Sequence, residues 1–93
     1  MRFEWDVAKN HSNHAKHGIS FELASRVFDD PLAVYLFDRI VDGEERWHAV
    51  GKIGNLPVLV VVHTYREQAG DEVIRIISAR QASSHERRQY EEA

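Results

Sequence analysis

The spacing of hydrophobic residues divides the chain into a helical first third and a strand-rich remainder. Up to about Asp30 the apolar positions recur mainly at intervals of three and four, whereas beyond Pro31 they alternate or run together. The first spacing is typical of amphipathic helices and the second of strands. The first third predicts a short strand and two helices, over residues 2–5, 6–17 and 20–29. The remainder predicts four strands and a final helix, over residues 33–37, 46–53, 58–66, 73–80 and from about 83 onward.

Residues suited to cap helices stand at these boundaries. Asp6 and Ser20 can cap the first two helices at their N-termini, and Gly18 can end the first of them. Ser83 and Glu86 match a capping box, in which each side chain bonds the backbone of the other residue. These residues predict where the helices begin and end.

The segments between the predicted strands carry turn residues. They are Asp42-Gly43-Glu44, Gly54-Asn55 and Gln68–Asp71, of which Gly54-Asn55 predicts a tight hairpin. Residues 58–62 are apolar on both faces, which is typical of a central strand. The fold class that follows is α+β, with a central antiparallel sheet, the two N-terminal helices on one face and a short C-terminal helix.

Composition narrows the class of protein. A chain of 93 residues with 43% hydrophobic and 29% charged residues fits one globular domain. The absence of cysteine excludes disulfides and zinc–thiolate sites and favours a cytoplasmic protein. The longest apolar run, residues 57–62, is too short to cross a membrane. A net charge of −3 argues against an unspecific nucleic-acid binder, although acidic residues concentrate between Phe21 and Glu72 and both ends are slightly basic.

The first predicted helix is unusually polar, so much of it is expected to contact water or a partner. Its apolar positions are Val7, Ala8 and Ala15. Three histidines recur at intervals of three residues: His11, His14 and His17. Such a series spreads over about 120° of the helix, which suits a tetrahedral metal site poorly. We expect neither a metal nor another cofactor.

The last predicted strand carries two arginines. Arg75 and Arg80 fall on opposite faces if the strand is regular, but a bulge near its end would re-aim Arg80. An arginine on an open sheet face can bind phosphate through two parallel hydrogen bonds, or it can cover the sheet with its stem. Arg80 has no evident ion-pair partner one helical turn away, so we expect it to be functional.

The C-terminal helix has two interpretations. The pairs Arg87–Glu91 and Arg88–Glu92, each four residues apart, predict a solvated, salt-bridged helix. A helix of about ten residues is nevertheless too short to be stable alone. Tyr90 is its only large apolar side chain, so we expect the ring to dock and the hydroxyl to point outward.

The segment His63-Thr64-Tyr65-Arg66 ends the predicted central strand. His63 and Tyr65 face one way, and Thr64 and Arg66 face the other. A histidine near a tyrosine is common in ordinary packing. The same pair would also suit RNA cleavage, in which a ring stacks a base and an imidazole or phenol moves protons.

Two blocks of sequence resemble the BrnT toxin family: FEWDVAKNHSNHAKHGISFELA (3–24) and RIISARQASSHERRQYEE (75–92). The resemblance implies a bacterial type II toxin with a RelE-like fold and a ribonuclease activity that arrests translation. It also implies a BrnA-type antitoxin encoded nearby, through which the complex binds operator DNA. We expect an acidic or amphipathic antitoxin segment to cover the polar first helix, the basic C-terminal end, or both. Gln81, Ser84 and His85 stand where the family is commonly more basic, which predicts weaker electrostatic binding of RNA.

The residues and the resemblance together predict a metal-independent ribonuclease. No clustered set of carboxylates suggests a two-metal nuclease, so the 2′-hydroxyl of the RNA would attack the adjacent phosphate with help from a base, an acid and cations. The candidate catalytic residues are Arg75, Arg80, His63, Tyr90, Lys9 and His17. The candidate RNA-binding residues are Lys16, Arg66, Arg87 and Arg88. The alternatives are a non-catalytic module that binds RNA or the ribosome, and a degenerate toxin that acts only as the antitoxin's co-repressor.

Overall fold

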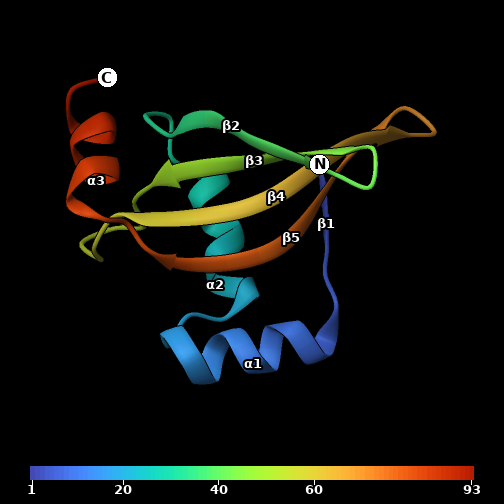
Figure 1. Ribbon diagram of the computed structural model, residues 1–93, viewed down its shortest axis with the longest axis horizontal. Coiled ribbons are helices and arrows are strands. Elements are labelled where there is room, and N and C mark those ends of the chain that lie inside the picture. Colours follow the sequence, from blue (N-terminus) through green and yellow to red (C-terminus); the bar gives the residue numbers. More distant parts are fainter.

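The computed structural model describes all 93 residues and has the predicted order of elements, in an α+β fold (Figure 1). The strands are β1 (Arg2–Glu4), β2 (Val34–Val41), β3 (Glu44–Gly51), β4 (Leu59–Gln68) and β5 (Asp71–Gln81). The helices are α1 (Val7–His17), α2 (Phe21–Ala24), the 3₁₀ helix η1 (Ser25–Asp29) and α3 (Ser84–Glu91). None of these helices has the length and apolar character needed to span a bilayer.

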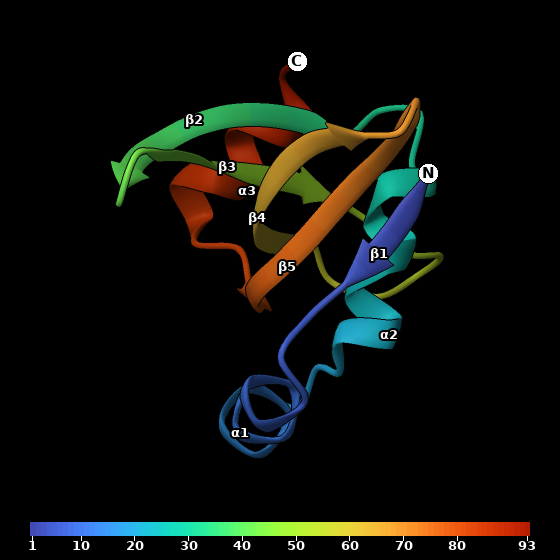
Figure 2. The ribbon, with the colours of Figure 1, turned by 90° about the vertical axis from the view of Figure 1, so that its right-hand side faces the viewer.

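The five strands form one sheet in the order β1-β5-β4-β3-β2. Strands β2 to β5 are antiparallel neighbours, but β1 pairs with β5 in parallel, so the sheet is mixed rather than wholly antiparallel. The sheet is twisted, with α2 on one side and α3 on the other (Figure 2). Strand β4, predicted to be central, lies between β3 and β5.

The connections between the antiparallel strands differ in kind. Asp42 and Gly43 have φ angles of 51° and 78°, and Ala69 and Gly70 have φ angles of 54° and 80°. Two consecutive positive φ angles are what a type I′ hairpin turn requires. The tight hairpin predicted at Gly54-Asn55 is wrong. A turn does lie there, but β3 ends at Gly51 and β4 begins at Leu59, so a longer loop joins the two strands.

The second predicted helix is correct only in part. It begins after the predicted cap Ser20 but is α-helical only to Ala24, and η1 continues it to Asp29. Phe21, Ala24 and Val27 are fully buried and lie three residues apart. Residues three apart lie close to one face of an α-helix and directly above one another in a 3₁₀ helix, so Phe21 and Ala24 of α2 and Val27 of η1 all face the core.

The apolar residues form two clusters, one on each face of the sheet. The larger cluster lies under α2 and η1 and contains Ile19, Phe21, Ala24, Val27, Ala49, Ile53, Leu59, Val61, Ile74, Ile76 and Ala79. The smaller cluster contains Val50, Val58 and Val60, and it receives Tyr90 and Ala82 from α3 and the segment before it. Burial on both faces therefore explains the continuous valine run of β4.

Two asparagines attach α1 to the rest of the protein. The buried Asn13 accepts a hydrogen bond from the Ala79 N–H (3.1 Å) and donates to the carbonyls of Ala79 and Ile19 (2.9 Å each). Its amide thus satisfies the edge of β5 beyond the point where β1 ends. Asn10 accepts a hydrogen bond from the Phe21 N–H at 2.8 Å. The polar face of α1 was expected to contact water or a partner, but at these two positions it faces the protein.

Replacing Asn13 by Ala is expected to lower the free energy of unfolding by about 2–4 kcal/mol, because buried backbone groups of β5 lose their partner. Urea unfolding measures this change. Asn55→Ala, at an exposed loop position, is the matched control. A loss below about 0.5 kcal/mol at Asn13, within the range of ordinary surface substitutions, would contradict this role.

Candidate active site

A bulge in β5 brings Arg75 and Arg80 to the same face of the sheet. Arg75 pairs with Thr64 and Arg80 with Val60, and the register shifts by one residue near Ile77. Thr64 and Val60 are four residues apart in β4 and therefore share a face. Both arginines consequently lie on the face opposite α2, which we call the open face. A regular strand would have placed the two arginines on opposite faces. The bulge places them on one face, so both can contact the same ligand.

A glutamate links two of the arginines on the open face. Arg66 donates a hydrogen bond from Nη1 to Oε1 of Glu4 at 2.7 Å, and Arg75 Nη1 lies 3.6 Å from the same oxygen. The hydrogen bond from Arg66 lowers the pKa of Glu4, so this carboxylate stays charged. Glu4 partly neutralises the pair and holds the two guanidinium groups side by side.

Arg80 is paired, contrary to the expectation from the sequence. Its Nη1 and Nη2 donate to Oε1 and Oε2 of Glu86 at 2.8 and 2.9 Å. Glu86 also accepts the Ser83 N–H at 2.9 Å, and the predicted capping box is confirmed. The pairing arises because the chain turns back after β5, which places the first turn of α3 beside the last residues of the strand. Arg80 is therefore held in a fixed orientation by α3.

The pair between Arg80 and Glu86 predicts a loss of stability in acid. The hydrogen bond from Arg80 lowers the pKa of Glu86 from its ordinary 4.5 to about 2. A depressed carboxyl pKa gives stability that is present above 4.5 and is lost as the pH falls from there towards 2. In urea unfolding, we expect the free energy of unfolding of wild type to exceed that of Glu86→Gln by about 1–3 kcal/mol at pH 7. At pH 3 this difference is expected to be smaller. A difference that does not change with pH would contradict the pairing.

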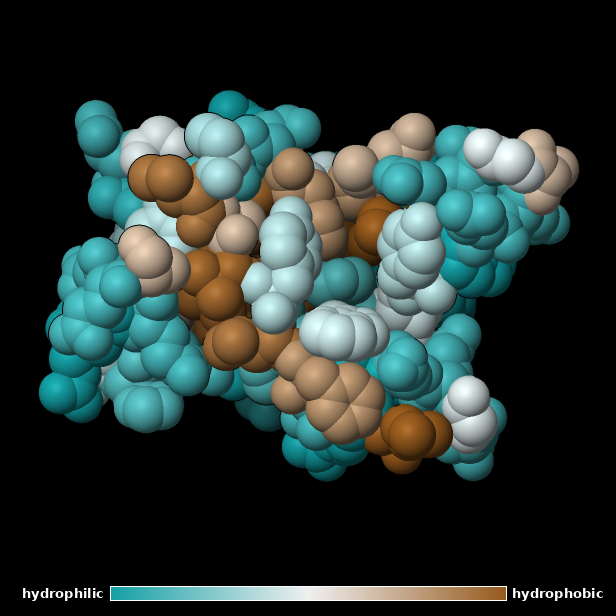
Figure 3. All heavy atoms as spheres, turned by 90° about the horizontal axis from the view of Figure 1, so that it is seen from above, coloured by the Kyte–Doolittle hydropathy of each residue, from teal (hydrophilic) through white to brown (hydrophobic).

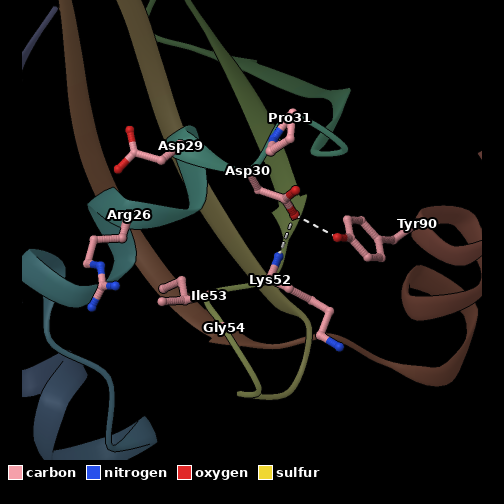
Figure 4. Close-up of a pocket in the computed structure, with 8 residues that line it drawn as sticks. All are labelled: Arg26, Asp29, Asp30, Pro31, Lys52, Ile53, Gly54 and Tyr90. Atoms are coloured by element: carbon pink, nitrogen blue, oxygen red, sulfur yellow. Dashed lines mark hydrogen bonds between the residues drawn. The ribbon is translucent and has the colours of Figure 1, made fainter.

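Tyr90 anchors α3 to the loop that precedes β2. Its hydroxyl donates a hydrogen bond to Oδ2 of Asp30 at 2.7 Å, and the same oxygen accepts the Lys52 N–H at 2.9 Å (Figure 4). This bond raises the pKa of Tyr90 to about 12. The pocket around the pair measures about 400 Å³ and is lined by Arg26, Asp29, Asp30, Pro31, Lys52, Ile53, Gly54 and Tyr90. The ring docks as expected, but the hydroxyl points inward and holds its proton, so the geometry gives Tyr90 an anchoring role.

Tyr90→Phe is expected to lower the free energy of unfolding by about 1–3 kcal/mol, because it removes a hydrogen bond to a charged carboxylate. Cleavage by the folded variant is expected to change by less than about threefold, well below the 10²–10⁴-fold contribution of a proton donor. Tyr35→Phe, whose hydroxyl is free, serves as the control in thermal unfolding and RNA cleavage. A folded Tyr90→Phe protein that fails to cleave RNA would restore the proton-transfer role.

The open face also carries a histidine–aspartate pair that was not predicted. His48 Nε2 lies 3.4 Å from Oδ2 of Asp38, and both side chains are mostly buried, at 21% and 16% exposed. His48 pairs with Val62, which pairs with Ser78 of β5, so the histidine lies two strands from Arg80 on the same face. The hydrogen bond that Arg80 donates to Glu86 is the main cause of the raised pKa of Arg80, and the charge of Asp38 contributes to the same shift. An imidazole and the two candidate arginines therefore face the same space.

One feature of the sequence conceals this pair. The strand predicted over residues 33–37 ends before Asp38, whereas β2 extends to Val41 with a bulge at Asp38. Alternation along β3 was available as a signal, because Arg46 and His48 alternate with Trp47. Arg46 lies two residues before His48 in β3 and shares its face, so its guanidinium adds a further cation to this region. The buried Nε of Arg46 has no hydrogen-bond partner.

The candidate residues of α1 gather beside the bulge of β5. Lys9, Lys16 and His17 line a hollow of about 230 Å³ together with Ser12, Asn13, Ile77 and Ser78. The hollow adjoins the strand that carries Arg75 and Arg80, which extends the cationic surface around the edge of β5. No group of three or more His, Asp or Glu side chains is arranged to hold a metal ion.

His63 lies on the other face of the sheet. It is 4% exposed, and its Nδ1 is 3.1 Å from the Val61 carbonyl oxygen. Its ring packs edge-on against Phe28, with the two ring centroids 4.8 Å apart. Burial lowers the pKa of His63. The sheet separates it from Arg75 and Arg80, so the geometry does not bring it into the same site.

Arg87 and Arg88 are exposed on α3. The predicted pairs Arg87–Glu91 and Arg88–Glu92 are not formed, because exposed pairs gain little and α3 ends at Glu91. Both guanidinium groups are therefore free to contact an anionic ligand near Arg80.

The comparisons with known proteins agree with this architecture. Residues 5–86 match the family model described as "Ribonuclease toxin, BrnT, of type II toxin-antitoxin system". Among solved structures, the Brucella abortus ribonuclease toxin BrnT is similar, with a TM-score of 0.65 and 33% sequence identity. The match covers 90% of this chain and 99% of that one. The search of curated proteins gives no match. The chain belongs to the BrnT family of toxins of type II toxin–antitoxin systems.

Proposed function

We propose that this toxin is a metal-independent endoribonuclease that arrests translation, with its active site on the open face. The observation that carries the proposal is the β5 bulge, which places Arg75 and Arg80 on the face that also holds the pair of His48 and Asp38. Guanidinium groups match phosphate oxygens, and imidazole is the side chain best suited to move protons near neutral pH. The ribonuclease description of the family supports the same conclusion.

In the proposed reaction the 2′-oxygen attacks the adjacent phosphorus, and the bond from phosphorus to the next 5′-oxygen breaks. His48 takes the proton of the 2′-hydroxyl on the ring nitrogen that does not face Asp38, and Asp38 stabilises the imidazolium. Arg75 and Arg80 stabilise the charge that develops on the phosphate oxygens. The leaving 5′-oxygen takes a proton from Lys9 or His17. The products are a 2′,3′-cyclic phosphate and a 5′-hydroxyl.

The remaining cations extend the binding surface for RNA. Arg66 lies beside Arg75, Lys16 lies in the hollow next to β5, and Arg87 and Arg88 lie on α3. Together they flank the central arginines along the path of a single strand. Because these contacts are electrostatic, RNA binding is expected to weaken with rising salt.

The proposed partner is a BrnA-like antitoxin, and the complex would contact operator DNA only through it. A type II toxin implies an antitoxin. An acidic or amphipathic segment over α1 and α3 would cover the cations of the site and block RNA. This contact is the simplest route to neutralisation.

Cleavage of an unstructured RNA by the purified chain, with and without the antitoxin encoded beside it, tests the proposal. We expect cleavage by the chain alone and protection by the antitoxin. RNA that is bound but remains intact would indicate a non-catalytic module. A chain that neither cleaves RNA nor arrests growth on induction, yet binds the antitoxin, would indicate a co-repressor.

A further inference from the structure

We propose that the antitoxin also docks on the aromatic side of the sheet, through an apolar segment that presents an arginine or lysine. The surface, here called the aromatic patch, consists of Tyr35, Phe37, Ile40, Trp47 and Tyr65. This inference rests on the antitoxin partnership and not on the cleavage mechanism.

The aromatic patch is the part of the helix-side face that α2 and η1 leave uncovered. Tyr35, Phe37, Ile40 and Tyr65 are 48%, 50%, 63% and 48% exposed. In Figure 3, apolar and aromatic side chains gather across the middle of the face over β2, between hydrophilic ends. A contiguous exposed patch of this kind marks an interaction surface more often than scattered apolar residues do.

A pocket of about 430 Å³ opens within the aromatic patch. Its lining is Met1, Phe28, Tyr35, Glu45, Trp47, His63, Tyr65, Glu72 and Ile74. The rings support one another: the centroids of Phe28 and Tyr35 are 6.1 Å apart, and those of Phe37 and Trp47 are 5.5 Å apart. The pocket has room for one long side chain with its stem against the rings.

The charges of the pocket select a cation. Glu45 and Glu72 are exposed, and no lysine or arginine lines the pocket. The ammonium group of Met1 is occupied by Asp71 at 3.4 Å, and buried His63 has a lowered pKa and stays neutral. Aromatic faces and carboxylates attract a guanidinium or ammonium group, whereas they repel the phosphates of RNA. The occupant is therefore a cationic side chain with apolar neighbours.

The edge of the sheet favours an extended partner segment. Strand β2 is the last strand on its side, so its outer backbone groups have no strand partner. The bulge at Asp38 interrupts regular pairing and leaves Val34–Phe37 available. A strand added there would place alternate side chains over the aromatic patch.

The test compares antitoxin affinity between wild type and the double variant Glu45→Gln, Glu72→Gln. We expect the variant to bind the antitoxin at least about tenfold more weakly, since a cation loses its carboxylate partners. The double variant Asp29→Asn, Asp42→Asn removes two exposed charges that lie outside the aromatic patch, α1 and α3, and it is expected to bind like wild type. RNA cleavage by the Glu45→Gln, Glu72→Gln protein is expected to be unchanged, because its folded open face is intact.

Antitoxin affinity that stays within twofold of wild type would overturn the inference. A fall in RNA binding with unchanged antitoxin affinity would overturn it as well, because the pocket would then be a nucleotide site. If wild type does not cleave RNA, the proposed function fails, while the affinity comparison still decides this inference.

Discussion

Replacing His48 by Gln is expected to lower the rate of RNA cleavage by about 10²–10⁴-fold, the usual contribution of a positioned proton-transfer group. The side chain lies on the open face, 3.4 Å from Asp38, in line with Val62 and Ser78 across the sheet. Glutamine keeps much of the volume and polarity but cannot take up the proton. Single-turnover cleavage of a short RNA measures the effect. Asp38→Asn is expected to show a smaller loss, because it alters only the support of the ring.

Two other histidines provide the comparison. His85→Gln, exposed on α3, is expected to cleave RNA like wild type. His63→Gln is expected to unfold more easily, since the ring packs in the interior, yet to retain cleavage in its folded fraction. An active His48→Gln protein together with a folded but inactive His63→Gln protein would reverse the assignment and place the reaction on the other face.

Arg75→Ala and Arg80→Ala are each expected to reduce cleavage by about 10²–10³-fold, the loss usually seen when one group that stabilises the transition-state charge is removed. Arg80→Ala should also lower the free energy of unfolding by about 1–3 kcal/mol, because Glu86 loses two charged hydrogen bonds. Cleavage is therefore compared at a temperature at which every variant is folded.

Arg26→Ala removes an exposed cation from η1, on the opposite face, and is the matched control. Glu86→Gln separates the charge of Arg80 from its orientation, because the guanidinium remains but is held less firmly. Its cleavage is expected to fall less than that of Arg80→Ala. Full activity in folded Arg75→Ala and Arg80→Ala would show that the two arginines only support the structure.

Features set by neighbouring residues could be predicted from the sequence. Asp6, Ser20 and Ser83 cap their helices as expected, and Gly18 ends α1 with a φ of 72°. Each of these depends on hydrogen bonds that span only three or four residues. The glycine at position 70 marks a hairpin for the same reason.

Features set by distant residues could not be predicted. The bulge of β5 depends on its register with β4, and the bond between Tyr90 and Asp30 joins residues 60 positions apart. Arg80 has no ion-pair partner at helical spacing in the sequence, whereas in the fold Glu86 reaches it across the turn after the strand. The sequence therefore shows which residue types could form a site, but only the fold shows which of them lie together.

The most direct test of the account is the chemistry of the RNA ends. Two versions of one RNA, identical except for a 2′-O-methyl group at the cleaved nucleotide, are incubated with the protein in EDTA, and the fragments are weighed by mass spectrometry. The account predicts 2′,3′-cyclic phosphate and 5′-hydroxyl ends from the unmodified RNA, and no cleavage at the methylated position. Fragments with 5′-phosphate ends, or cleavage at the methylated position, would contradict it.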